Sequence, residues 1–291
     1  MPGDAGAAVA ERRGGDLDLA LTAAAPLIWG STYLVTTELL PGEHPLTVSL
    51  LRALPAGCLL LLLVRRLPWG IWWPRVLVLG GLNFSLFWAL LFVSAYRLPG
   101  GVAATVGAIQ PLIVVVLERL FMGTPIRRVS IAAGLAGILG VGLLVLRPEA
   151  ALDPIGIAAG LCGAASMAAG TVLSRLWQPP VPPLTFTAWQ LTAGGLLLLP
   201  VTFLVDRMPP DFTTTNLMGF LYLGLIGGAV TYLIWFRGLA RLSPSRVSPL
   251  VLLSPVCAVI LGWAPLGQDL TPIQLAGFVL VLGSVWLSQR P

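Results

Sequence analysis

Ten apolar runs, each long enough to cross a lipid bilayer, account for most of this chain. The hydrocarbon core of a bilayer is about 30 Å thick, and a helix needs roughly 20 apolar residues to cross it. The runs are continuous and do not alternate with polar residues, so they predict helices and not barrel strands. We therefore expect an all-α integral membrane protein with ten transmembrane helices. The predicted helices cover residues 19–40, 46–64, 75–96, 102–122, 129–147, 155–175, 184–205, 217–239, 246–264 and 271–288.

The charged residues lie mainly at the ends of these runs and predict the topology. Only 10% of the residues are charged, and all 17 basic residues are arginines. If the N-terminus is cytoplasmic, the arginines divide very unequally, as the positive-inside rule requires. The outer side receives only Arg97, Arg147 and Arg207, and the inner side receives Arg12, Arg13, Arg65, Arg66, Arg75, Arg119, Arg127, Arg128, Arg175, Arg237, Arg241, Arg246 and Arg290. We expect a multi-pass protein of the cytoplasmic (inner) membrane with both termini, and a tail of residues 1–18, in the cytoplasm.

The residue types that are missing exclude several classes of function. A Walker A loop needs a lysine and Schiff-base chemistry needs an amine, so ATP-driven transport is not expected. The net charge of +5 comes from the arginines at helix ends and does not indicate nucleic-acid binding. The single histidine, His44, lies in a predicted loop, and the cysteines lie inside apolar runs, where a thiol behaves as a small hydrophobe. No cluster for metal or covalent catalysis is visible, so we expect no cofactor, no metal and no enzymatic activity.

The two halves of the chain repeat one another. A shift of 138 residues aligns LTVSLLRALPAGCLLLLLV, from Leu46, with LTFTAWQLTAGGLLLLPV, from Leu184. A shift of 144 residues aligns Arg97 with Arg241, Leu98 with Leu242, and Pro111 with Pro255. Because five helices per copy is an odd number, the second copy enters the membrane from the opposite side and the repeat is inverted. Chance alignment of leucine-rich helices is the alternative. Inverted copies can exchange conformations around a site at the midplane, an arrangement typical of transporters.

Four stretches carry a family resemblance. They are PLIWGSTYLV in the first predicted helix, AYRLPGGVAATVGAIQPL across the third and fourth, GLARLSPSRVSPLVLLSPV across the eighth and ninth, and LTPIQLAGFVLVLGSVWL in the tenth. The chain resembles the EamA-type permeases of the drug/metabolite transporter superfamily, and the second stretch resembles the pigment (indigoidine) exporter branch. The resemblance implies two EamA-type repeats, residues 19–147 and 155–288, around a cavity lined mainly by helices 1, 3, 4, 6, 8 and 9. It also implies export of amino acids or other metabolites.

Aromatic and polar residues within the helices are the candidates for lining such a cavity. Aromatic rings would favour planar or apolar substrates, although lipid contact or helix packing accounts for any single one. The polar residues would contact substrate or hydrogen-bond between helices. Pro111 and Pro255 each remove a helical hydrogen bond and predict kinks. The substrate-cavity candidates are Trp29, Tyr33, Asn83, Phe87, Trp88, Gln110, Ser166, Trp189, Tyr232, Trp235 and Ser254, with Phe84 in the aromatic set.

Arg52 is the only charged residue well inside an apolar run, about 9 Å from the predicted outer end of its helix. A charge at this depth is costly and indicates a function. The alternatives are that Arg52 extends outward to the interface or pairs with Glu38 as a structural clamp. Its repeat counterpart is the neutral Gln190, so any role of the charge belongs to one half only. No mid-membrane carboxylate is visible for proton coupling, and Glu118 beside Arg119 is either the best candidate or half of an interfacial ion pair.

Together these features predict a secondary transporter that exports a small metabolite by alternating access. The substrate classes that fit are an amino acid, an aromatic compound or a pigment-like compound. The expected partners are this small molecule and the bilayer, and the sequence leaves a homodimer open. Two alternatives remain: a membrane assembly or structural protein without flux, and an intramembrane enzyme.

Overall fold

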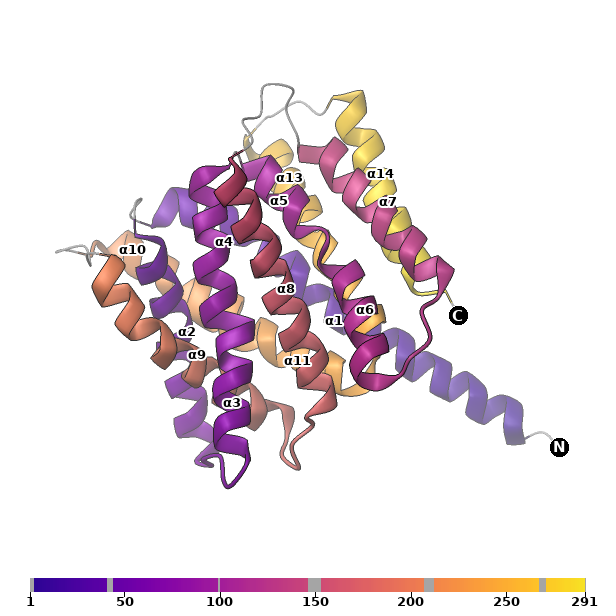
Figure 1. Cartoon of the computed structure of the whole chain (residues 1–291), viewed down its shortest axis with the longest axis horizontal. Coiled ribbons are helices and arrows are strands. Elements are labelled where there is room, and N and C mark those ends of the chain that lie inside the picture. The colour runs from indigo at the N-terminus through magenta and orange to yellow at the C-terminus, as the bar shows by residue number, and fades with distance from the viewer. Residues whose placement is uncertain are drawn as a thin grey trace.

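Ten helical spans form one bundle in the computed structural model of the chain (Figure 1). The structure describes residues 3–40, 44–98, 100–145, 153–206, 212–266 and 271–290. Six spans are unbroken helices: α1 (Gly3–Leu39), α2 (Pro45–Val64), α7 (Arg128–Val145), α8 (Pro154–Leu176), α9 (Pro183–Val205) and α14 (Pro272–Ser288). The other four are built from consecutive segments: α3 (Trp72–Gly80), η1 (Gly81–Ser85) and α4 (Leu86–Arg97); α5 (Gly100–Gly107) and α6 (Gln110–Met122); α10 (Thr214–Leu221), η2 (Tyr222–Val230) and α11 (Thr231–Arg241); α12 (Pro244–Val247), η3 (Ser248–Leu252) and α13 (Leu253–Leu266).

These spans coincide with the ten predicted runs. Nine segments of the described chain are long and apolar enough to cross a membrane, and α14 has 17 residues, close to the lower limit for a membrane helix. The predicted all-α fold with ten transmembrane helices is confirmed. The structure differs at the start, because α1 begins at Gly3, within the segment predicted as a tail. This segment contains the helix-favouring run Ala7–Arg13 and projects beyond the bundle in Figure 1.

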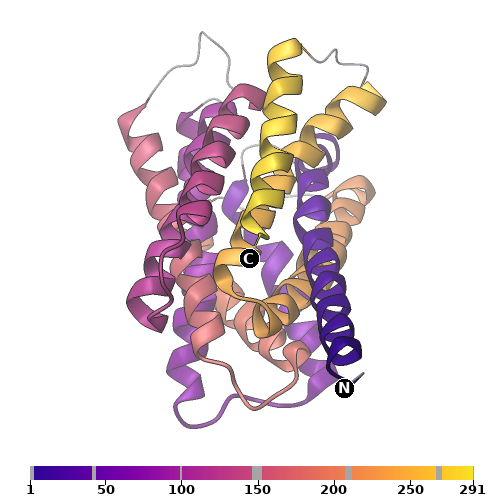
Figure 2. The ribbon, with the colours of Figure 1, turned by 90° about the vertical axis from the view of Figure 1, so that its right-hand side faces the viewer.

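One end of the bundle collects the connections that follow α2, α6, α8 and α11. Those after α2 and α8 form the lower edge of the view in Figure 2. Trp189 of α9 donates from Nε1 to the carbonyl of Arg66 (2.6 Å), and Arg127 donates to the carbonyl of Arg290 (2.7 Å). We call it the basic end, because its described arginines are Arg65, Arg66, Arg75, Arg119, Arg127, Arg128, Arg175, Arg237, Arg241, Arg246 and Arg290. These are the arginines that the positive-inside rule assigns to the cytoplasm.

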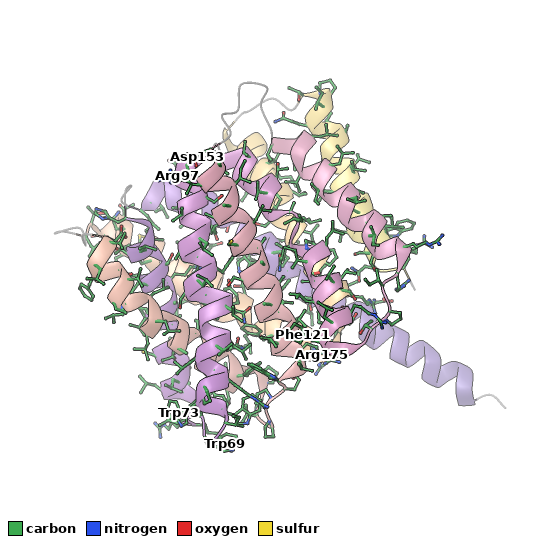
Figure 3. All side chains as sticks on the ribbon, viewed as in Figure 1. Trp69, Trp73, Arg97, Phe121, Asp153 and Arg175 are labelled. Carbon is green, nitrogen blue, oxygen red and sulfur yellow. The ribbon has the colours of Figure 1, made fainter. Side chains whose placement is uncertain are left out.

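The opposite end carries the starts of α2, α5, α8, α10 and α14. Asp206, just after α9, accepts a hydrogen bond from the backbone N–H of Thr47 in α2 (2.7 Å). Arg97, at the end of α4, pairs with Asp153, just before α8 (3.4 Å), and Figure 3 labels both. The first repeat (α1–α7) therefore begins at the basic end with α1, whereas the second repeat (α8–α14) begins at the opposite end with α8. The predicted inversion of the two repeats is confirmed.

Matching helices of the two repeats pack against each other, and glycines permit the closest approach of α2 and α9. A Cβ atom added to Gly57 would lie 2.5 Å from the backbone nitrogen of Thr192, and one added to Gly195 would lie 2.7 Å from the Cα of Leu54. The shift of 138 residues relates Gly57 to Gly195 and Leu54 to Thr192, so this contact is symmetric. Small residues of this kind allow helix backbones to touch within a bilayer.

The helices α7 and α14 meet through glycines in the same way. A Cβ atom added to Gly140 would lie 2.8 Å from the backbone nitrogen of Val281, and one added to Gly277 would lie 2.6 Å from that of Leu144. Two pairs of touching backbones thus join the repeats, one on each side of the remaining six spans. This frame positions the helices that hold the candidate site.

The third and eighth spans each contain a π-helical segment at equivalent positions. The shift of 144 residues places η1 on residues 225–229, inside η2. A π segment inserts an extra residue into the turn and is frequent at functional sites. The predicted kinks at Pro111 and Pro255 take the form of breaks: a turn at residues 108–109 precedes Pro111, and the 3₁₀ segment η3 precedes Pro255. All four irregularities occur in the spans that the sequence analysis assigns to the cavity.

Candidate functional site

Six aromatic residues from α1, η1, α4 and α11 form one cluster between the two repeats. Its centre is Tyr232, whose ring centroid lies 4.6 Å from that of Phe84 and 5.0 Å from that of Trp29. Trp88 lies 6.3 Å from Tyr232, and Trp235 lies 5.2 Å from Trp29. We call the aromatic cluster the set Trp29, Phe84, Trp88, Tyr232, Trp235 and Phe236. The structure thus brings together four of the predicted cavity residues and Phe84.

Trp29 is the one member of the aromatic cluster that is only half-buried. Its indole Nε1 donates to the hydroxyl of Thr231 (2.8 Å), and this hydroxyl donates to the carbonyl of Gly227 in η2 (2.8 Å). Two residues further along α1, Ser31 shares a hydrogen bond with the hydroxyl of Tyr222 (2.7 Å). The first and eighth spans are therefore joined by polar contacts beside the aromatic rings.

Arg52 reaches from α2 to the same place. It donates from NH2 to the carbonyl of Gly227 (2.7 Å), and its guanidinium carbon lies 5.2 Å from the centroid of the Trp88 ring. The residue is half-buried. Glu38 is exposed, and the ion pairs of the described residues do not join it to Arg52. Among the described contacts, Arg52 is joined to η2 and not to Glu38.

The second repeat builds the corresponding bridge from neutral side chains. Asn83 of η1 donates from Nδ2 to Oε1 of Gln190 in α9 (2.8 Å) and to the hydroxyl of Ser174 in α8 (3.1 Å). All three residues are fully buried. The shifts of 138 and 144 residues relate Gln190 to Arg52 and Asn83 to Gly227. We call these contacts the amide bridge (Asn83 and Gln190) and the arginine bridge (Arg52 and Gly227).

The remaining polar candidates lie on helices around the cluster. Ser166 of α8 donates to the carbonyl of Leu82 in η1 (2.8 Å), which is an interhelical hydrogen bond like that of Asn83. Gln110, the first residue of α6, is buried, and Ser254 in α13 is half-buried. Their contact with a substrate stays a prediction.

The aromatic candidates outside the cluster divide in the structure. Phe87 is half-buried and packs against the core that contains the aromatic cluster. Trp189 lies near the basic end, where its ring meets Trp69 edge-on with centroids 5.4 Å apart. The contacts of Trp189 hold the connection between α2 and α3, a role that its position within an apolar run does not reveal. The side chain of Tyr33 lies outside the described residues.

The basic end is held closed by contacts between the two repeats. Glu118 of α6 is 2% exposed, and its carboxylate accepts a hydrogen bond from the backbone N–H of Ser245 in α12 (2.9 Å). Within the second repeat, Arg175 of α8 donates to the carbonyl of Ala240 in α11 at the same end. Glu118 does not form the expected ion pair with Arg119, which instead donates to the carbonyl of Gly123 at the end of its own helix (2.9 Å).

The opposite end lacks the matching contacts. At the basic end, α12 packs on α6 and on α8, and α11 packs on α8. In the repeat, α12, α6, α8 and α11 correspond to α5, α13, α1 and α4. The equivalent contacts at the opposite end would therefore be α5 on α13, α5 on α1 and α4 on α1. Among the described residues these three pairs make at most isolated contacts. The two repeats therefore share a fold and most of their packing, but within the described residues the contact of α12 with α6 at the basic end has no comparable counterpart between α5 and α13 at the opposite end.

Two sets of ion pairs join the start of each repeat to the third span of the other repeat. Arg97 pairs with Asp153 at the opposite end, whereas Arg241 and Arg237 pair with Asp18 at the basic end (3.1 and 2.7 Å). The 144-residue shift relates Arg97 to Arg241. The repeat alignment identifies Arg97 and Arg241 but not their ion-pair partners. An aspartate close before the first predicted span of each repeat, Asp18 and Asp153, was the sequence feature that could have predicted these pairs.

An apolar groove with a volume of about 660 Å³ lies away from the aromatic cluster, between α7 and α14. It is lined by Leu143, Leu275, Ala276, Val279, Leu280 and Gly283. Leu275 and Val279 are exposed, which suits contact with lipid chains. The groove has no charged or hydrogen-bonding side chain with which to select a substrate.

Comparison with known proteins decides the family. The profile of the EamA-like transporter family matches residues 18–146 and again residues 154–289, once on each repeat. The chain belongs to this family. It is therefore a multi-pass membrane transporter of the EamA type, as the sequence motifs predict.

Individual relatives and a solved structure agree with this assignment. Protein PecM of Dickeya dadantii (strain 3937) is 45% identical over 267 residues, which cover 91% of this chain and 90% of PecM. The uncharacterized inner membrane transporter YedA of Escherichia coli (strain K12) is 30% identical over 272 residues, with coverages of 90% and 87%. A crystal structure matches with a TM-score of 0.80 over 94% of this chain and 96% of that chain. Its sequence identity is 20%, so it supports the fold alone.

Proposed function

We propose that this EamA-type protein is a secondary transporter that exports a small metabolite from the cytoplasm by alternating access. The observation that carries the proposal is the unequal packing of the two ends. Inverted repeats that are alike in fold can exchange their conformations, and the exchange closes one end while it opens the other. A bundle in which the basic end is joined by the contact of α12 with α6, without a comparable contact of α5 with α13 among the described residues, fits one of the two states that such an exchange requires.

The orientation follows from the arginines. The positive-inside rule favours a cytoplasmic basic end, and we therefore assign this bundle to a state closed to the cytoplasm. The opposite state would separate α12 from α6 and α8. It would therefore break the hydrogen bond between Glu118 and the Ser245 N–H, which joins the first repeat to the second.

The aromatic cluster supports an aromatic or pigment-like substrate. The cluster lies between the repeats and beside the π-helical segments η1 and η2, and the indole of Trp29 is half-buried. Planar molecules stack favourably on such rings. The resemblance to the pigment exporter branch favours the same substrate class. Amino acids with aromatic side chains fit the same description.

Metabolite efflux tests the export function directly. Cells with the gene and cells without it would be loaded with aromatic amino acids, planar pigments and toxic analogues, and retention would be followed over time. We expect cells with the gene to lose at least one of these compounds faster. Equal retention across the whole panel, with the protein present in the membrane, would contradict the proposal.

Glu118 provides a test of the alternating mechanism. We expect Glu118→Ala to destabilise the closed basic end and to lower export, because the Ser245 N–H loses its acceptor. A cysteine at position 245 keeps that N–H and reports access from the cytoplasmic side in inverted vesicles. Its labelling by a maleimide should rise severalfold in the Glu118→Ala background. Arg119→Gln, which changes the exposed neighbour, is the matched control and should leave labelling and export unchanged.

A further inference from the structure

The two repeats use the same bridge with different chemistry. In each repeat the second helix sends one side chain to a π segment of the other repeat: Gln190 to Asn83 in η1, and Arg52 to Gly227 in η2. The amide bridge is neutral and fully buried. The arginine bridge is charged and half-buried.

The amide bridge shows that helix packing at this position needs no charge. A glutamine side chain is enough to connect the second helix of a repeat to the π segment that faces it. A charge in the interior of a membrane protein is costly and is usually retained for a function. The contact with the Gly227 carbonyl therefore does not by itself account for the charge of Arg52.

The surroundings of Arg52 indicate which ligand the charge serves. The guanidinium lies over Trp88, whose ring belongs to the aromatic cluster, and Gly227 is joined through Thr231 to Trp29. A guanidinium has five N–H donors in a planar fork, enough to hold one carbonyl and to bind a carboxylate through two parallel hydrogen bonds. A positive group and a set of aromatic faces thus lie side by side at the centre of the bundle.

We propose that Arg52 binds the carboxylate of an aromatic substrate whose ring lies against the aromatic cluster. This inference rests on the proposed transport function and narrows it, because it selects planar carboxylates over neutral and cationic compounds of the same shape. In this arrangement Arg52 touches the substrate and determines specificity, and the Gly227 carbonyl holds the guanidinium in place. The neutral amide bridge has no equivalent role.

Binding to the purified full-length protein in detergent tests the site without requiring flux. Three probes share the indole ring and differ in charge: indole-3-acetate, indole-3-acetamide and tryptamine. We expect the wild-type protein to bind indole-3-acetate about tenfold more tightly than the amide, since a charge-assisted bidentate contact is stronger than a neutral one. Tryptamine should bind more weakly still. Equal affinity for the acetate and the amide in the wild-type protein would overturn the proposal, whatever the variants do.

Variants of Arg52 test whether this residue causes the preference for the acetate. Arg52→Gln introduces the residue type that Gln190 has at the equivalent position of the other repeat, so it should keep the bridge and lose the preference for the acetate. Arg52→Lys keeps the charge without the planar fork and should retain part of the preference. Arg119→Gln removes an exposed arginine of the basic end and should change nothing. An Arg52→Gln protein that is folded, as judged by its thermal midpoint and gel filtration, and that still prefers the acetate would also overturn the assignment.

Flux measurements separate this proposal from the general function. The same three probes would be assayed for uptake into liposomes that contain the protein. Preferential binding of the acetate without uptake of any compound would leave the Arg52 site standing and would contradict the transport function. Uptake with no preference for the acetate would support transport and reject the Arg52 site.

Discussion

At the scale of single residues, Gly170 is the position on which the amide bridge most directly depends. A Cβ atom added to Gly170 would overlap the side-chain amide of Asn83, which is fully buried. We expect Gly170→Ala to displace this amide and to leave Gln190 without its partner, at a cost of about 1–3 kcal/mol. The thermal midpoint of the purified protein should fall by several degrees.

A second glycine supplies the control for this substitution. Gly283 of α14 has nothing within 4 Å of an added Cβ, so Gly283→Ala should leave the midpoint unchanged or raise it slightly. Equal losses at both positions would show that alanine harms these helices in general. The amide bridge would then have no special importance.

The sequence reveals some of these residues and hides others. Arg52 is visible because a charge inside an apolar run needs no knowledge of the fold. The difference between Trp88 and Trp189 is not visible, because both lie in apolar runs. Only the folded chain brings the Arg66 carbonyl to Trp189 and the guanidinium of Arg52 to Trp88. The partner of Asn83 is hidden for the same reason, since Gln190 lies on a different span.

At the scale of single helices, Asp153 fixes the start of α8. Its carboxylate accepts a hydrogen bond from the backbone N–H of Gly156 (2.7 Å), and this contact, followed by the charge of Arg97, lowers the pKa of Asp153 below its ordinary value of 3.8. A carboxyl group whose pKa is lowered by folding stabilises the fold above its unfolded-state pKa, and the contribution disappears as the pH falls through the folded-state value. We therefore expect stability to decrease below about pH 4.

Substitution of Asp153 separates the helix cap from the charge. Asp153→Asn keeps a side-chain oxygen for the Gly156 N–H, so the start of α8 should persist, but the ion pair with Arg97 and its pH dependence should be lost. Asp153→Ala should lower the thermal midpoint further at neutral pH. Thermal unfolding between pH 3 and pH 7 measures both effects, with the exposed Asp16→Asn as the control. An unchanged acid dependence in Asp153→Asn would show that other carboxyl groups cause it.

Helix positions follow from the sequence more readily than helix form. Apolar runs predict the ten spans because bilayer thickness sets their length. The π segments η1 and η2 are not predicted, since they differ from α-helix only by one step in the hydrogen-bond pattern. The break before Pro111 has a local cause in the missing N–H, and it could be predicted as an irregularity. The helical form of residues 3–18 was missed because their charge suggested only a location outside the membrane.

At the scale of the whole molecule, the sequence predicts the symmetry but not the state. An odd number of helices per repeat and the distribution of the arginines are enough to predict the inversion. Under the proposed alternating access either end can close, so the same sequence would support both conformations. The structure shows the one in which Glu118 meets Ser245 at the basic end. Which end is closed depends on small differences in contact energy that no single motif displays.

Labelling of single cysteines tests the orientation of the whole bundle. His44 precedes α2 at the opposite end, and Ile126 lies in the connection between α6 and α7 at the basic end, where it is exposed. A membrane-impermeant maleimide added to intact cells should label His44→Cys and not Ile126→Cys, because the basic end faces the cytoplasm. In inverted vesicles the preference should reverse.

The wild-type chain supplies the background for this measurement. Its described cysteines, Cys58, Cys162 and Cys257, lie within the spans, where the bilayer or the protein shields them from a charged reagent. The reversed result, with Ile126→Cys labelled in intact cells, would place the basic end outside. The state described above would then be closed to the outside. The assignment of the closed end to the cytoplasm therefore depends on this measurement, whereas the fold, the aromatic cluster and the arginine bridge do not.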